Sequence, residues 1–193
     1  MGILKKIITF PAEVFLRLRN FLYRLFFGIM NLVLGATIIS IGVLSLASLL
    51  SYNALDESLN TVSDSPTENI LGVPGSYISD ILVQSLGILS IIIPIILIVF
   101  GFYKIIGKLK NLWIKLTLVL IGLFLLAASF EMAFGSGGIF GSVFLKEINS
   151  LIYKLSITLN TNLLENNLFI YSFYSLLGVF SSIIITYGLL PSV

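Results

Sequence analysis

The sequence predicts an all-α integral membrane protein in which four transmembrane helices cross the bilayer. Of its 193 residues, 58% are hydrophobic and only 10% are charged, which leaves no stretch able to build a sizeable soluble core. Uncharged runs recur at about the 20 residues needed to cross hydrocarbon. Lys and Arg gather on alternate sides of those runs. We expect two further helices, one interfacial at the N-terminus and one amphipathic in the second outer loop.

The first 24 residues are predicted to be a cytoplasmic amphipathic segment. Pro11 suits a first helical turn, and Glu13, Arg17, Asn20 and Arg24 recur every three or four residues opposite an apolar face. This pattern indicates an interfacial helix on the inner leaflet. The alternative is a cytoplasmic extension of the first span, because Arg19 lies off the polar stripe.

Residues 25–193 are predicted to form one four-helix membrane domain. The spans are expected at about 26–51, 78–103, 112–131 and 168–190, with outer loops at 52–77 and 132–167. All Lys and Arg residues except Lys146 and Lys154 precede the first span, lie between the second and third, or, in the case of Lys115, stand at the start of the third. The positive-inside rule assigns that side to the cytoplasm, so both termini are expected there.

Small residues mark one face of several spans. Span one carries Gly28, Gly35 and Gly42 at a seven-residue spacing, span two carries Gly87, Pro94 and Gly101, and span four has a weaker version in Gly178 and Ser182. Such faces allow close backbone approach. We interpret them as packing within one bundle, with subunit contacts as the alternative. Pro94 is also expected to kink span two near its middle.

The second outer loop contains a glycine-rich reversal followed by a helical pattern. After Gly135-Ser136-Gly137-Gly138, apolar residues from Phe140 to Leu155 repeat at helical spacing. Residues 139–155 are therefore predicted to be an amphipathic helix on, or dipping into, the outer leaflet. A fifth span is the alternative, but it would insert Lys146 and Glu147 into lipid.

Several chemistries are excluded by residue types. The chain has no Cys and no His, which removes thiolate chemistry, the usual zinc ligands and any Ser/His relay. No charged residue lies deep in a predicted span, which disfavours an ion-coupled carrier. The acids of the first outer loop lack the spacing of a calcium loop. We predict no catalytic, cofactor or metal site, and hence no enzyme within this chain.

Three segments, 51–58, 69–80 and 135–141, resemble the outer loops of the membrane domain in the FtsK/SpoIIIE DNA translocase family. The residues that carry this resemblance are Asn53, Asp56, Ser58, Asn69, Gly72, Pro74, Gly75, Asp80, Gly135, Gly137, Gly138 and Gly141. Departures from the family pattern include Glu57 in place of a usual proline, and Ser76 and Ser79 in place of common alanines.

The resemblance implies a membrane-anchoring and septum-targeting domain of a DNA translocase that acts in cell division and chromosome segregation. It implies the bacterial inner membrane at the division septum, with the lipid bilayer and other septum membrane proteins as partners. Self-association into a hexamer, DNA contact, ATP and Mg would all belong to a motor downstream of this chain, and we expect the reading frame to continue past Val193. The alternative is a small channel or transporter subunit whose small-residue faces line a passage.

Overall fold

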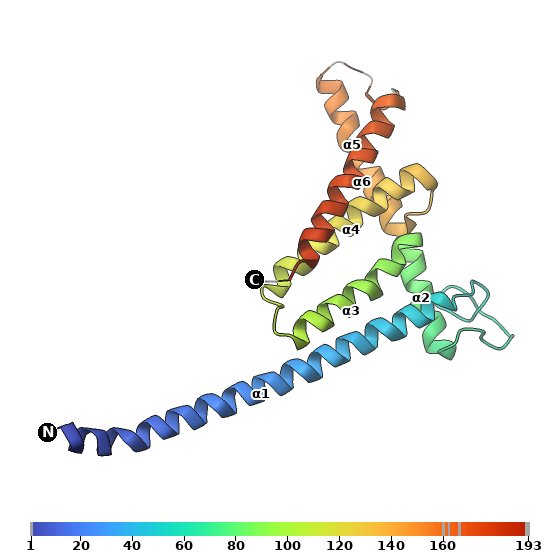
Figure 1. The fold of residues 1–193 in the computed structure, drawn as a ribbon. Helices are drawn as coiled ribbons and strands as arrows, with labels where there is room; N and C mark the ends of the chain where they lie inside the picture. Colours follow the sequence, from blue (N-terminus) through green and yellow to red (C-terminus); the bar gives the residue numbers. More distant parts are fainter. Residues whose placement is uncertain (1, 160, 162, 166, 192–193) are drawn as a thin grey trace.

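The computed structural model describes the backbone of residues 2–159, 161, 163–165 and 167–191, with the side chains of these residues except 2–13 and 164. Figure 1 shows the arrangement of the helices. They are α1 (Gly2–Leu50), α2 (Gly72–Leu86), the 3₁₀ helix η1 (Gly87–Ile91), α3 (Ile92–Ile105), α4 (Leu112–Phe134), α5 (Gly138–Thr158), the 3₁₀ helix η2 (Leu163–Glu165) and α6 (Asn167–Leu189).

Four segments of the described chain are long and apolar enough to cross a membrane. They are Val14–Leu50, Gly72–Ile105, Leu112–Phe134 and Asn167–Leu189. No strand occurs among the described residues. The predicted all-α class with four membrane-crossing helices is confirmed.

The N-terminal segment does not form a helix of its own. The α1 helix runs without interruption for 49 residues, so the backbone follows the alternative of an extension of span one, and Pro11 lies inside the helix rather than at its first turn. No Gly or Pro occurs between residues 12 and 27, so nothing in the local sequence would break the helix before the apolar run.

The second span contains a break, and its position differs from the predicted one. The α2 helix ends at Leu86, because the φ of 59° at the following Gly87 departs from α-helical values. From there η1 leads into α3 at a clear angle to α2 (Figure 1). Pro94 is only the third residue of α3. Proline is tolerated there because the first N–H groups of a helix have no partner within it. The bend therefore comes from Gly87 and not from Pro94.

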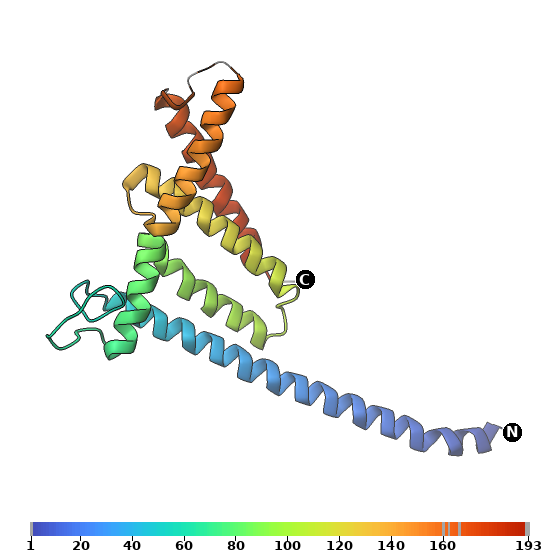
Figure 2. The same cartoon turned by 180° about the vertical axis from the view of Figure 1, so that it is seen from behind.

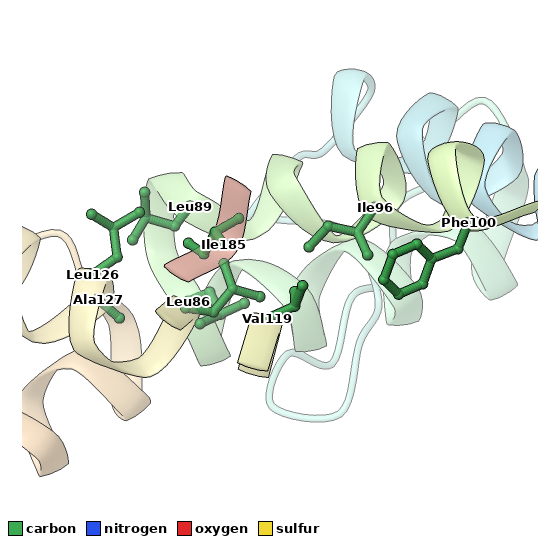
Figure 3. Packing of buried hydrophobic residues seen from close by; sticks show 9 residues of the cluster. Leu86, Leu89, Ile96, Phe100, Val119, Leu126, Ala127 and Ile185 are labelled. Atoms are coloured by element: carbon green, nitrogen blue, oxygen red, sulfur yellow. The ribbon is translucent and has the colours of Figure 1, made fainter. Parts of the chain in front are cut away.

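The helices form two antiparallel pairs. The α1 helix lies along α3, and α4 lies along α6, while α2 crosses the end of α1 and α5 crosses α4 (Figures 1 and 2). The hydrophobic core lies where α2, η1 and α3 meet α4 and α6 (Figure 3). Its buried members are Leu86, Leu89, Ile96, Phe100, Val119, Leu123, Leu126, Ala127 and Ile185.

Connections between the helices lie on two opposite sides of the molecule. In Figures 1 and 2 the N-terminal end of α1, the connection 106–111 and the end of α6 point toward one side. The long loop 51–71 and the glycine-rich connection between α4 and α5 lie toward the other side. This arrangement follows from two antiparallel pairs in sequence.

The α5 helix is the element predicted as amphipathic at 139–155. Its Phe140 and Phe144 rings pack against Phe124 of α4, with ring centroids 4.9 and 5.0 Å apart, while Lys146 and Glu147 are exposed. It is not one of the four segments apolar enough to cross a membrane. A fifth span is therefore not supported.

Candidate functional site

The α1 and α3 helices touch through paired glycines. A Cβ atom on Gly35 would lie 2.6 Å from the carbonyl oxygen of Gly101, and one on Gly101 would lie 2.7 Å from that of Gly35. Gly42 makes the same kind of approach, with 2.9 Å to the carbonyl oxygen of Pro94. These four residues form what we call the α1/α3 seam. Gly28 belongs to the same sequence stripe, but nothing lies within 4 Å of its Cβ position.

A second seam joins α4 to α6, and it uses glycines that the sequence pattern did not single out. A Cβ on Gly122 would lie 2.6 Å from Cγ1 of Ile185, and one on Gly188 would lie 2.7 Å from Cγ2 of Val119. Ser181 is fully buried in the same seam. In the sequence, each of these two positions is marked only by a small residue within an apolar run, without the seven-residue glycine repeat of α1.

Of the two residues predicted for span four, Gly178 faces α4 and Ser182 does not. The Cβ position of Gly178 is 3.6 Å from Cβ of Ser129, an ordinary van der Waals contact. Ser182 is exposed, and its hydroxyl donates to the Gly178 carbonyl within α6. Gly178 precedes Ile185 by seven residues and lies on the same stripe of α6 as Ser181, Ile185 and Gly188, whereas Ser182 lies beside that stripe.

Gly87 lies against the glycine-rich connection after α4. A Cβ on Gly87 would clash with the carbonyl oxygen of Ser136, and the amide of Ile88 donates to that oxygen at 3.2 Å. Gly138, with φ of 66°, would place a Cβ 2.7 Å from the amide nitrogens of Leu86 and Gly87. We call this backbone contact the glycine junction. It joins the broken second span to the start of α5.

The remaining glycines of this connection fix how α4 turns into α5. Gly135 ends α4 in the left-handed region, with φ of 61°. The amide of Gly137 donates to the Glu131 carboxylate at 2.8 Å, and a Cβ on Gly137 would clash with the Ala127 carbonyl. A Cβ on Gly141 would lie 2.7 Å from that same oxygen. Close crossing of α4 and α5 thus requires both glycines.

The loop 51–71 is organised around the buried carboxylate of Asp56. This side chain is only 4% exposed, and its two oxygens accept the backbone amides of Glu68 and Asn69, each at 2.9 Å. A carboxylate that accepts backbone N–H groups forms stronger hydrogen bonds than a neutral acceptor. Asp56 therefore closes the loop 51–71 upon itself.

Asn69 connects that loop to the end of α1. Its amide nitrogen donates to the carbonyl oxygen of Ser48 at 2.9 Å and more weakly to that of Ser51 at 3.3 Å. Its side-chain oxygen accepts the amide of Leu71 at 3.1 Å. These bonds satisfy carbonyls that a helix C-terminus leaves without partners.

The start of α2 fits tightly against these groups. A Cβ on Gly75 would collide with Oδ1 of Asn69, so only glycine fits there. The Ser48 hydroxyl, fully buried on α1, donates to the Gly75 carbonyl. The hydroxyl of Ser79 donates to the same oxygen at 3.0 Å. The structure thereby brings Asp56, Asn69 and Gly75 together, and we call this set, with Ser48 and Ser79, the loop frame.

The other loop residues of the resemblance lie around this frame. The Asn53 amide donates to Glu68 at 2.8 Å. Gly72 begins α2 with φ of 66°, and Pro74 occupies the first turn of that helix. Ser58 is buried, and its hydroxyl oxygen has no hydrogen-bond partner among the described residues.

Asp80 holds α2 against the end of α1. Its carboxylate accepts the Gln84 side-chain amide at 2.8 Å and the Tyr52 hydroxyl at 3.5 Å. Burial, followed by the negative charge of Asp80, raises the pKa of Tyr52 above its ordinary value. The phenol is thus protonated at neutral pH and able to donate to Asp80.

The loop frame presents apolar side chains to the outside. Leu55, Leu59, Val62 and Ile70 are all more than half exposed, and Val62 reaches 97%. Among the described residues no group of three acidic, His or Cys side chains gathers to hold a metal ion.

These features define a polytopic helical membrane domain with two glycine seams and a structured loop at 51–71. Residues 29–183 match the family described as the 4TM region of the DNA translocase FtsK/SpoIIIE, and the chain belongs to that family. The match covers the membrane region of the family and not its motor.

Comparison with curated relatives supports the same family assignment. The chain is 32% identical over 124 residues to the DNA translocase FtsK of Rickettsia bellii, which covers 60% of this chain and 17% of the relative. It is 27% identical over 125 residues to that of Brucella melitensis (60% and 15%), and 42% identical over 67 residues to that of Caulobacter vibrioides (35% and 8%). The chain thus spans less than a fifth of the length of these relatives. No solved structure matches it.

Proposed function

We propose that this domain anchors a DNA translocase in the bacterial inner membrane and places it at the division septum, where the complete protein acts in chromosome segregation. The observation that carries the proposal is the match of residues 29–183 to the membrane region of a family of DNA translocases. The motor, with its ATP and Mg, would follow this domain, and the domain itself would carry out no catalysis.

The sorting of connections supports cytoplasmic termini. The connection 106–111 contains Lys108 and Lys110, and Arg17, Arg19 and Arg24 lie on the α1 extension at the same side. The opposite loop 51–71 contains only acidic charges. Cytoplasmic loops are enriched in Lys and Arg. A DNA motor must lie in the cytoplasm. A tether to it would therefore have to leave the membrane on the basic side, where α6 ends.

The outer loop is the proposed contact for other septum membrane proteins. Its backbone is held by the loop frame, so Leu55, Leu59, Val62 and Ile70 are presented from an ordered support. Exposed apolar side chains outside the bilayer are characteristic of interaction surfaces. Self-association of the complete protein would add to such contacts.

The glycine faces favour an anchor over a channel. The space beside Gly35 is occupied by the backbone of Gly101, and the space beside Gly101 by that of Gly35. The space beside Gly122 is occupied by the Ile185 side chain. In a channel such small residues would line a passage instead. No further observation favours the channel alternative.

Topology can be tested by labelling, because the chain has no cysteine of its own. In intact cells a membrane-impermeant maleimide should label Ser65→Cys in the outer loop, which is exposed. It should label Lys108→Cys only after the inner membrane is permeabilised. The reverse pattern would overturn the proposed orientation.

Septum placement can be tested with a fluorescent protein fused after Val193. We expect the fusion to concentrate at mid-cell during constriction. A matched variant with Leu55, Val62 and Ile70 changed to Ser should remain in the membrane but lose that enrichment. An even distribution of the unmodified fusion around the envelope would contradict septum targeting.

A further inference from the structure

A groove of about 440 Å³ lies on the lysine-rich side of the molecule, between the start of α4 and the end of α6. Its lining combines two basic side chains with apolar ones. The basic residues are Lys110 and Lys115, and the other lining residues are Asn111, Ile114, Leu118, Tyr187, Leu190 and Pro191.

The groove sits at the depth of lipid headgroups. The 23 residues of α4 extend for about 35 Å at 1.5 Å per residue, slightly more than the roughly 30 Å of a bilayer's hydrocarbon core. The first turn of α4 therefore lies at the membrane surface. Trp113, 81% exposed in that turn, is the residue type that concentrates at this depth.

The charges of the groove are complementary to a phosphate. The Lys115 ammonium donates to the Leu190 carbonyl, so its position at the groove is fixed by α6. Lys110 is on the exposed connection beside it, and Lys104 and Lys108 add positive charge nearby.

We propose that this groove binds an anionic phospholipid, with the phosphate at Lys110 and Lys115 and an acyl chain along Ile114, Leu118 and Leu190. Basic pockets between transmembrane helices bind anionic headgroups in this way, and each cation near the surface contributes a preference of about five-fold. The lipid would join α4 to α6 beneath the point where the proposed tether leaves the membrane. The inference requires only that the domain is embedded in a bilayer, so it can fail while septum targeting holds.

The single tryptophan of the chain makes the site measurable. The chain is reconstituted in phosphatidylethanolamine vesicles that contain brominated phosphatidylglycerol or, at equal mole fraction, brominated phosphatidylcholine. Bromine quenches tryptophan fluorescence at short range, so Trp113 reports which lipid occupies its surroundings. We expect phosphatidylglycerol to be preferred about five-fold or more. Equal quenching by the two lipids would overturn the proposal.

Three variants separate a site from general attraction. K110Q should abolish most of the preference, whereas the neighbouring K108Q and the distant K146Q on α5 should retain it. K110Q keeps the Lys115–Leu190 bond, and its helix content is checked by circular dichroism. An equal loss in K108Q would indicate a diffuse basic surface and overturn the site.

Native mass spectrometry of the unmodified chain gives an independent measurement, in which phosphatidylglycerol should remain bound where phosphatidylethanolamine does not.

A final arm separates a bilayer lipid from a soluble phosphate. Glycerol 3-phosphate at millimolar concentration should leave the quenching preference unchanged, because it lacks the acyl chains that the apolar wall would hold. Loss of the preference would show that the phosphate alone is recognised and would overturn the assignment to a phospholipid.

Discussion

Gly35 and Gly101 exclude a side chain from each other, since a Cβ on either one would lie within 2.7 Å of the other's carbonyl oxygen. This relationship sets the distance between α1 and α3. In a bilayer, helix association depends on such close packing because lipid supplies no hydrophobic force between helices. Even one added methyl group should therefore separate the pair.

We predict that Gly35→Ala lowers the free energy of unfolding by about 1–3 kcal/mol, the usual cost of overpacking. Thermal unfolding in detergent, followed by circular dichroism, measures the change. Gly28→Ala is the matched control, because its Cβ would meet nothing within 4 Å and should be neutral or slightly stabilising. Equal effects of the two substitutions would remove Gly35 from the seam.

Asp56→Asn should destabilise the loop frame by about 1–3 kcal/mol, because one of two backbone amides loses its acceptor and the remaining bond loses its charge. We expect faster proteolysis of residues 51–71 while the helix content is unchanged. Asp64→Asn, at an exposed position of the same loop, controls for the loss of one charge. A loop as resistant as that of the unmodified chain would contradict the role of Asp56.

Gly87→Ala tests the glycine junction. Gly87 has φ of 59° and ψ of −133°, a sparsely populated conformation that costs an L-residue about 1–3 kcal/mol, and a Cβ there would also clash with the Ser136 carbonyl. Gly72→Ala also places an L-residue at positive φ, but its Cβ would meet nothing within 4 Å. We expect the thermal unfolding midpoint of Gly87→Ala to fall further than that of Gly72→Ala, because only the former adds the clash. Identical midpoints would show that the junction does not constrain the fold.

The α4/α6 seam predicts opposite signs for two glycines. Gly122→Ala should destabilise, because its Cβ would lie 2.6 Å from Ile185. Gly178→Ala should be neutral or stabilising by up to about 1 kcal/mol, since alanine favours the helix and its nearest contact is 3.6 Å away. Chemical unfolding of each variant in detergent provides the comparison. A destabilising Gly178→Ala would show that α4 and α6 pack as tightly at Gly178 as at Gly122.

Much of the architecture follows from local patterns. Uncharged runs between basic and acidic segments predicted four membrane-crossing helices, since charged residues are costly in hydrocarbon. Helical spacing after Gly138 indicated α5. The same reasoning misplaced the bend of span two, because the effect of Pro94 depends on where the helix begins, and only the glycine junction determines that beginning.

By itself the sequence determined the class of protein and the family, since length, hydropathy and the spacing of Asp56, Asn69 and Gly75 are written along the chain. Only the tertiary structure decided which small residues touch. Gly28, Gly35 and Gly42 are equivalent in sequence, yet Gly28 is open because α3 ends near Gly35. Likewise, Asp56 is one acid among several until the fold directs two amides at it. Contacts between distant segments depend on how the helices pair, which no local pattern specifies.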